Sequence, residues 1–145
     1  MKMKRLKGRW TVRKLFRFEA AHRLASAYSK VCTDTVHGHS YRVEVFLSTD
    51  KMNKDNMVMD FGEVKKCVEP MLEAWDHAVM IPLSISNGHD NGVLGKKVFY
   101  TSGNPTAEWM AALLYSSIKH NGLPVSKVRV HETETGWAEY EEVRS

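Results

Sequence analysis

The chain has 145 residues, of which 43% are hydrophobic and 26% are charged, with a formal net charge of +4. These values are typical of one soluble globular domain with its own core. No stretch approaches the roughly 18 consecutive apolar residues that cross a bilayer, which argues against a membrane protein. The two cysteines, Cys32 and Cys67, are too few for a disulfide framework and indicate a reducing, cytoplasmic compartment.

A basic tail occupies residues 1–10, and five of its first nine residues are lysine or arginine. No apolar segment follows the charges, so the tail does not have the form of a signal peptide. We interpret it as a solvated terminus. Because interleaved aromatic and basic residues are lacking, we expect no nucleic-acid partner. Residues 11–145, which contain no repeat or linker, are predicted to form a single domain.

Hydrophobic periodicity predicts four strands and two helices. The first helix starts at Asp60, which with Glu63 has the spacing of a capping box, and Pro70 kinks it before it ends near residues 75–77. The second helix opens with a proline in its first turn. The strands span residues 11–20, 40–48, 125–132 and 137–143. The second helix runs from 104–106 to 121–122. Residues 81–95 form a loop, and a candidate short strand follows it at 96–100.

This order of elements predicts an α+β domain, with two helices packed on one face of an antiparallel four-stranded sheet. An open sheet of this kind leaves two edge strands with unpaired backbone groups. Proteins cover such edges or pair them with another chain. We therefore expect oligomerisation through the strand edges.

Two histidines, His37 and His39, stand one glycine apart where the second strand begins. Residues two apart on a strand share a face, so both rings can point at one ion, and Gly38 leaves the space between them free. A catalytic zinc ion usually has three protein ligands and one open position. The best third ligand is His22, at the end of the neighbouring first strand. A lone histidine is more often an ordinary residue, but the three together favour a metal site.

Four further residues are candidates for chemistry. Cys32 lies five residues before His37 and could be a fourth ligand, an activated base or nucleophile, or an ordinary loop cysteine. Asp76 could hold His77 in one tautomer, although adjacent side chains often diverge. Glu132 alternates with two apolar valines, so its carboxylate could face a ligand with adjacent N–H donors or could instead reach water. We interpret Cys67, within the first helix, as structural.

Taken in order, these motifs resemble the family of 6-pyruvoyl-tetrahydropterin synthase and 6-carboxytetrahydropterin synthase. The resemblance extends from about residue 16 to residue 140, nearly the whole chain outside the basic tail. Its motifs are Phe18-Glu19-Ala20-Ala21-His22-Arg23-Leu24, Cys32 before His37-Gly38-His39-Ser40-Tyr41, Met59-Asp60-Phe61-Gly62-Glu63, Asp76-His77, Asn104-Pro105-Thr106-Ala107-Glu108 and His131-Glu132-Thr133.

The resemblance implies the tunnelling fold, or T-fold. In this fold the sheets of three subunits close into a β-barrel, and two trimers stack into a homohexamer. Such an assembly would remove the free strand edges expected above.

The resemblance also implies roles for individual residues. Zinc would be bound by His22, His37 and His39. Cys32 would abstract a proton, and Asp76 with His77, which a neighbouring subunit could contribute, would relay or return it. Glu132 would anchor the 2-amino-4-oxo edge of a pterin in a pocket that Thr106 and Glu108 also line.

The activity implied first is that of a zinc-dependent 6-carboxy-5,6,7,8-tetrahydropterin synthase of the queuosine route. This lyase converts 7,8-dihydroneopterin triphosphate to carboxytetrahydropterin with release of acetaldehyde and triphosphate. The alternatives are a 6-pyruvoyl-tetrahydropterin synthase, which eliminates triphosphate and keeps the side chain, and a non-catalytic pterin- or metal-binding homologue.

Two features depart from the family pattern. Four residues separate Cys32 from His37, where three are expected in bacterial carboxy-forming members and five in animal pyruvoyl-forming ones. The segment 81–103 is also longer than in compact members.

Overall fold

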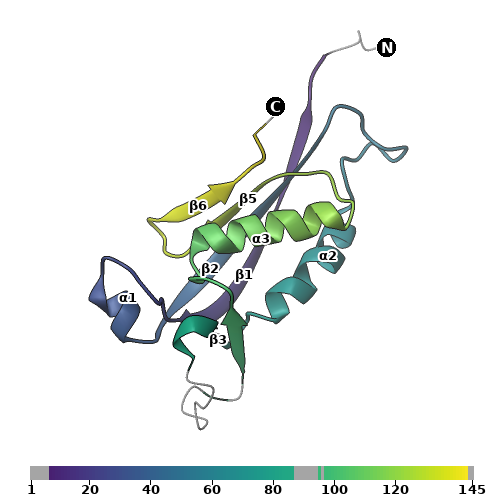
Figure 1. Ribbon diagram of the computed structural model, residues 1–145. Coiled ribbons are helices and arrows are strands. Elements are labelled where there is room, and N and C mark those ends of the chain that lie inside the picture. The colour runs from purple at the N-terminus through teal and green to yellow at the C-terminus, as the bar shows by residue number, and fades with distance from the viewer. Residues whose placement is uncertain (1–6, 87–94, 96, 144–145) are drawn as a thin grey trace.

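A computed structural model of the chain describes residues 7–86, 95 and 97–143 (Figure 1). The first six residues of the basic tail and part of the predicted 81–95 loop lie outside this range. Among the described residues, six strands form one sheet in the order β4-β3-β1-β2-β5-β6. The strands are β1 (Trp10–His22), β2 (His37–Thr49), β3 (Ala78–Pro82), β4 (Val98–Thr101), β5 (Val125–His131) and β6 (Trp137–Tyr140).

The centre of the sheet is the long antiparallel pair β1 and β2. Their ladder runs without a shift from Trp10 opposite Thr49 to His22 opposite His37. On the far side of β2, β5 and β6 continue the antiparallel order. The four predicted strands are therefore confirmed, but β1 and β2 extend further toward their shared loop than predicted. This extension places all three histidines of the predicted metal site inside the ladder.

The prediction of a four-stranded, antiparallel sheet is wrong in its strand count and in its directions. β3 pairs in parallel with the last three residues of β1, and β4 pairs in parallel with β3. β3 begins directly after the predicted helix end and runs into the predicted loop, whereas β4 overlaps the candidate short strand at 96–100. The chain enters β3 directly because His77 adopts a positive φ of 57°, which turns the backbone in one residue. A short apolar run after such a turn carries no alternation that would mark it as a strand.

Two long helices, α2 (Phe61–Glu73) and α3 (Ala107–His120), match the two predicted helices. The Asp60 side chain caps α2 by accepting from the Gly62 N–H at 2.7 Å, and Pro70 lies within the helix. Thr106 caps α3 and Pro105 precedes the cap, so this proline is not in the first turn as predicted. A short helix, α1 (Lys30–Asp34), and a 3-10 turn, η1 (Leu83–Ile85), were not predicted. None of the described helices is long and apolar enough to cross a membrane.

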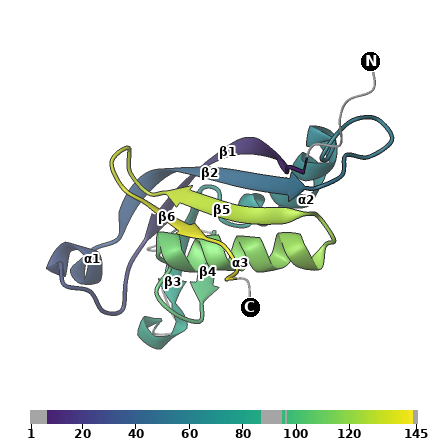
Figure 2. The same cartoon turned by 90° about the horizontal axis from the view of Figure 1, so that it is seen from above.

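The core lies between one face of the sheet and the two long helices, as predicted. Figure 1 shows α3 crossing in front of the long strands, and Figure 2 shows the same layering from above. Alternate residues of β1, β2 and β5 point into this layer and are almost fully buried. They are Phe16, Phe18, Tyr41, Val43, Val45, Leu47, Val128 and Val130, which pack against Val64, Val68, Leu72, Met110, Ala111, Leu114 and Ile118 of the helices.

The opposite face of the sheet is charged and centres on Glu44, which is only 6% exposed. Its carboxylate accepts from Arg13 at 2.6 Å and from His131 Nε2 at 2.8 Å, and Arg129 lies 3.4 Å away. Burial alone would raise the pKa of Glu44. The hydrogen bond from His131 and the charges of Arg129 and Arg13 outweigh burial, and they hold the pKa below its ordinary value. The carboxylate therefore stays charged, and this face is not a second hydrophobic core.

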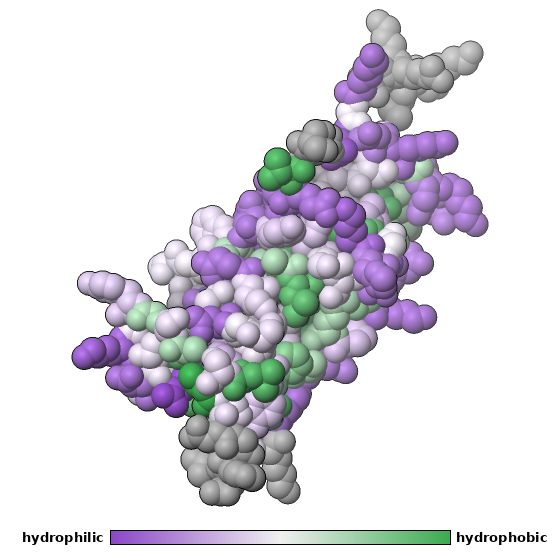
Figure 3. Space-filling model, viewed as in Figure 1, coloured by the Kyte–Doolittle hydropathy of each residue, from purple (hydrophilic) through white to green (hydrophobic). Residues whose placement is uncertain are grey.

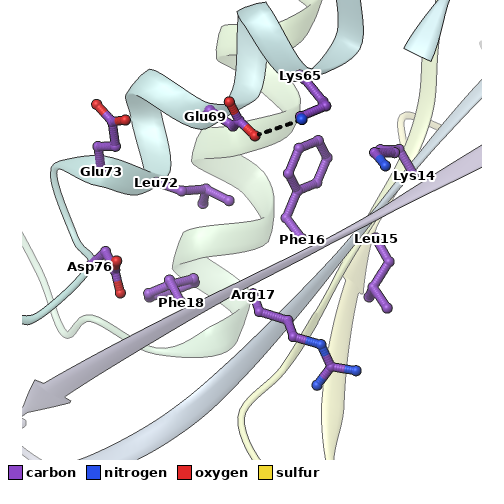
Figure 4. A pocket seen from close by; sticks show the side chains of 10 residues that line it. All are labelled: Lys14, Leu15, Phe16, Arg17, Phe18, Lys65, Glu69, Leu72, Glu73 and Asp76. Carbon is purple, nitrogen blue, oxygen red and sulfur yellow. Dashed lines mark ion pairs between the residues drawn. The ribbon is translucent and has the colours of Figure 1, made fainter. Parts of the chain in front are cut away.

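Most of β1 forms a free edge, because β3 pairs only with its last three residues. Figure 4 shows the groove of about 360 Å³ between this edge and α2. Phe16 and Leu72 line the groove, and Lys65 and Glu69 of α2 form an ion pair of 3.6 Å beside it. β6 is the last strand at one end of the sheet, and among the described residues it pairs with β5 alone. Figure 3 shows the surface of the face seen in Figure 1. On this face many apolar residues gather toward the middle and the lower end, within a largely polar surface.

Replacing Leu114 tests the position of the core. Leu114 is 1% exposed, whereas its neighbour Leu113 on the same helix is 40% exposed. We expect Leu114→Ala to lower the free energy of unfolding by about 2–5 kcal/mol, because it leaves a cavity between α3 and the sheet. Leu113→Ala, the matched control, should cost less than about 1 kcal/mol. Urea titrations at equal protein concentration measure both, and equal losses would contradict the packing described.

Candidate metal centre

The metal centre predicted from the sequence lies at the end of the β1–β2 ladder. His22 is directly opposite His37, and His39 is opposite Ala20. Because the side-chain alternation of the two strands is in phase, all three rings lie on the face that carries the core. His22 is 2% exposed, so it is buried as deeply as the neighbouring core residues. The ladder, rather than a loop, positions the three imidazoles.

The ring nitrogens converge on one point. The Nε2 atoms of His22 and His37 are 3.0 Å apart, and one ligand atom from each of the three histidines lies within 4.8 Å of the others. His22 Nδ1 lies 2.9 Å from the carbonyl of Pro105 and His37 Nδ1 lies 3.3 Å from that of Thr35. A carbonyl only accepts, so both Nδ1 atoms carry the proton in the neutral ring and both Nε2 atoms present lone pairs. Two lone pairs at this distance repel each other unless a cation lies between them.

The surroundings of His22 and His39 favour the neutral, metal-binding form of these two rings. Burial lowers the pKa of His22 and of His39, although the nearby charge of Glu132 acts in the opposite direction. His39 Nε2 is buried and has no hydrogen-bond partner among the described residues, and its ion-pair contact there is the Glu132 carboxylate at 3.1 Å. A buried ring nitrogen without a hydrogen bond is costly, and a metal ion would satisfy it. The three residues therefore fit a metal ion with imidazole ligands.

Sequence reasoning missed two groups that position His22. The Pro105 carbonyl, which fixes the ring tautomer, lies 83 residues further along the chain, just before α3. The Tyr41 hydroxyl is 3.3 Å from the same nitrogen, and burial raises the pKa of this tyrosine. Metal-bound histidines usually form such a second hydrogen bond to a carbonyl or carboxylate. The alternation that buries Tyr41 was a usable signal, but nothing local to either segment links Pro105 to His22.

The Glu132 carboxylate lies beside two of the histidines. It follows the last residue of β5, on the same face as Val128 and Val130. Its Oε1 atom is 3.3 Å from His22 Nε2 and 3.1 Å from His39 Nε2. The side chain is 35% exposed, so part of the carboxylate remains open to a ligand.

Cys32 lies in α1, outside the histidine cluster. Two bonds tie α1 to the end of β1: Leu24 N–H donates to the Cys32 carbonyl at 2.9 Å, and Arg23 Nε donates to the Thr33 carbonyl at 2.6 Å. Cys32 is thus held next to the strand that carries His22, and its thiol is free and half-buried. No hydrogen bond or ion pair joins it to the three histidines in the described part of the chain. Its predicted role stays a prediction.

Asp76 and His77 form the pair that the sequence suggested, with Asp76 Oδ1 3.0 Å from His77 Nδ1. The same carboxylate accepts from the Glu19 N–H at 2.9 Å. This backbone bond, together with His77 and Lys97, lowers the pKa of Asp76 although burial opposes it. His77 is 76% exposed and, with His39 and Ser40, lines an open pocket of about 420 Å³. Within one subunit, no hydrogen bond or ion pair among the described residues joins Asp76 or His77 to His22, His37 or His39.

Thr106 and Glu108 remain predictions as pocket residues. The Thr106 hydroxyl already accepts from the Trp109 N–H at 3.2 Å as the cap of α3. Glu108 is exposed in the first turn of the same helix.

The model of the 6-pyruvoyl tetrahydropterin synthase family matches residues 11–143 of the chain. The chain belongs to this family. Two relatives carry the name 6-carboxy-5,6,7,8-tetrahydropterin synthase. The one from Helicobacter pylori (strain J99) is 33% identical, with 88% of this chain and 70% of the relative covered. The one from Aquifex aeolicus is 32% identical, with 92% and 99% covered.

Two solved structures share the fold. The 6-pyruvoyl tetrahydropterin synthase of Caenorhabditis elegans superposes with a TM-score of 0.69 at 23% identity, covering 94% of this chain and 97% of that one. An uncharacterized protein of Wolinella succinogenes superposes with a TM-score of 0.73 at 21% identity, covering 93% and 99%. The resemblance inferred from the sequence motifs is confirmed for the family and for an α+β fold of this type.

Removing any one histidine tests the metal centre. We expect His22→Ala, His37→Ala and His39→Ala each to retain well under half of the metal that wild-type protein holds, since two imidazoles are too few for a stable site. The control is His120→Ala, at the exposed end of α3. Elemental analysis by mass spectrometry after dialysis gives the metal content per chain. Full metal content in the His22 variant would show that the third ligand is another residue.

Proposed function

We propose that the chain is a zinc-dependent 6-carboxy-5,6,7,8-tetrahydropterin synthase. Its substrate would be 7,8-dihydroneopterin triphosphate, and its products 6-carboxytetrahydropterin, acetaldehyde and triphosphate. The observation that carries this proposal is the convergence of three imidazoles next to the partly exposed carboxylate of Glu132. Relatives named for this activity, matched over most of the chain, support it. Both cysteines are free thiols, which supports a reducing, cytoplasmic setting.

In this proposal His22, His37 and His39 hold the zinc ion. All three ligands are neutral, so they leave the full charge of the ion for the substrate. When bound, zinc supplies Lewis-acid chemistry, which polarises the hydroxyl groups of the substrate side chain. The hydrogen bonds from the His22 and His37 Nδ1 atoms to the carbonyls of Pro105 and Thr35 keep both rings oriented with Nε2 toward the ion.

Glu132 is proposed to anchor the pterin ring. A carboxylate only accepts hydrogen bonds and matches the adjacent N–H donors on the 2-amino-4-oxo edge of a pterin. Thr106 and Glu108 would line the same pocket from the start of α3. That start lies close to the site, because the Pro105 carbonyl next to it accepts from His22.

Proton transfer is assigned to Cys32, Asp76 and His77. The Cys32 thiolate would abstract the proton, and His77, oriented by Asp76, would relay or return it. Asp76 and His77 directly precede β3, and the largely exposed His77 lines the open pocket beside β1 and β3. This placement supports a site in which the pair serves the zinc centre of a neighbouring subunit.

Such a shared site requires an oligomer, and we propose a β-barrel trimer that stacks into a homohexamer. The free edges of β1 and β6 support this assembly, since strand edges of neighbouring subunits can pair. The proposed ligands are small molecules, and neither nucleic acid nor a membrane is a proposed partner.

The second candidate is a 6-pyruvoyl-tetrahydropterin synthase, which the name of the matching family model favours. Product analysis separates the two activities. Zinc-loaded protein is incubated with dihydroneopterin triphosphate, and the products are identified by mass spectrometry. We expect acetaldehyde and a carboxypterin. A pyruvoyl pterin would replace the proposal with the second candidate, and bound pterin without turnover would indicate a non-catalytic homologue.

Mixed oligomers test whether the site is shared between subunits. We expect Cys32→Ala and His77→Gln each to lose most activity. If one site takes Cys32 from one subunit and His77 from the next, equal mixing after dissociation restores activity to roughly a quarter of wild type, because that fraction of interfaces carries both groups. The control is each variant dissociated and reassembled alone. Activity that stays at the level of the controls would place both residues in the same subunit's site.

A further inference from the structure

Two arginines lie directly opposite each other on the charged face of the sheet. Arg17 of β1 is in register with Arg42 of β2, and Arg42 is in turn opposite His131 of β5. Residues opposite each other on neighbouring strands point to the same face, so the three side chains form one row across three strands. Figure 4 shows Arg17 pointing away from α2, on the opposite side of β1 from Phe16. The row therefore lies on the face away from the histidine cluster.

The other cations of this face have carboxylate partners. Arg13 lies 2.6 Å from Glu44. Arg129 and Lys127 lie 2.8 Å and 3.4 Å from Glu139. Away from the row, positive and negative side chains on neighbouring strands are thus matched, as a stable sheet requires.

Arg17 and Arg42 have no carboxylate partner among the described residues. The acid nearest to Arg17 on the same strand face is Glu19, whose carboxylate accepts from the Ser40 hydroxyl at 2.6 Å. Arg42 makes a long hydrogen bond of 3.5 Å to His131 Nδ1. Two like charges directly opposite each other destabilise a sheet. An anion that contacts both guanidinium groups would turn this repulsion into a binding site.

We propose that Arg17 and Arg42 bind a phosphate-class anion. The planar fork of a guanidinium group matches the oxygen geometry of phosphate and can donate two parallel hydrogen bonds to it. Neighbouring strands lie about 4.7–4.9 Å apart, so the two long side chains can reach the same phosphate group. Arg17 is exposed and Arg42 is half-buried, so an anion can enter from solvent and still lose part of its water. This inference goes beyond the proposed function, because the site lies on the other face of the sheet from the metal centre.

Two anions of this class are candidates, inorganic phosphate and the triphosphate that the proposed reaction would release. Titration calorimetry of the assembled, metal-loaded protein with inorganic phosphate and with tripolyphosphate distinguishes them. The salt concentration should be about 150 mM, because distant attraction between exposed charges is then largely screened. Tighter binding of tripolyphosphate would support the longer anion, and similar affinities would support phosphate. Binding of neither would overturn the proposal. No turnover is measured, so the result does not depend on the proposed activity.

Arginine variants locate the site. We expect Arg17→Gln and Arg42→Gln each to weaken anion binding about 10-fold or more, because each removes charged hydrogen bonds to the anion. The matched control is Lys14→Gln, which removes the same charge from the same strand. Its side chain lies on the α2 side, with Nζ 5.9 Å from the centre of the Phe61 ring, so this variant should bind as wild type does. Equal weakening in the control would show attraction by net charge alone. Wild-type affinity in both arginine variants would place the anion elsewhere, and either result would overturn the proposal.

Melting temperatures separate an anion from a carboxylate of a neighbouring subunit as the partner of Arg17. In phosphate-free buffer Arg17→Gln should melt at or above the temperature of wild type, because it removes the repulsion between the two guanidinium groups. Saturating phosphate should raise the melting temperature of wild type and leave that of the variant nearly unchanged, since a ligand stabilises only the protein that binds it. If a carboxylate of a neighbouring subunit pairs with Arg17 instead, the variant will melt below wild type in both buffers, and the proposal fails.

Discussion

The antiparallel register of β1 and β2 is the constraint on which the rest of the molecule depends. The same alternation that buries Phe18 and Tyr41 against the helices also turns the three histidines to that face. A shift of one residue would send the whole set to the charged face, where Glu44 lies. The register is therefore fixed by core packing on one side of the sheet and by the ion pairs of the buried Glu44 on the other, and the metal ligands depend on both.

Much of the candidate site could be predicted because its ligands lie on strands. A strand has one simple rule, that residues two apart share a face, and this rule links His37 to His39 and Glu132 to the valines before it. The hairpin partner of β2 then supplies His22. The carbonyl of Pro105 could not be found in this way, because its place beside His22 depends on how α3 packs on the sheet. Contacts between distant segments carry no local pattern.

The errors in the predicted fold have a common physical cause. β3, which was not predicted, is short, runs parallel to its neighbours, and follows the positive φ of His77, a conformation that is uncommon for any residue with a side chain. No sequence signal predicts such a turn.

α1 has five residues and is stabilised by its attachment to Arg23 and Leu24 rather than by helix propensity. Because this attachment follows the last ladder residue, the loop that carries Cys32 can vary in length without moving the metal ligands.

The buried position of His22 also links metal occupancy to folding. Its ring connects the end of β1, the start of β2 and the segment before α3, and it does so in a cluster where unprotonated nitrogens face one another. A metal ion that relieves this repulsion binds only the folded chain, and at a free concentration of 100 times its dissociation constant it adds about 2.7 kcal/mol to the free energy of unfolding. Preparations that differ in metal content will therefore differ in melting temperature. A broad or double melting transition would then report mixed metal loading rather than misfolded protein.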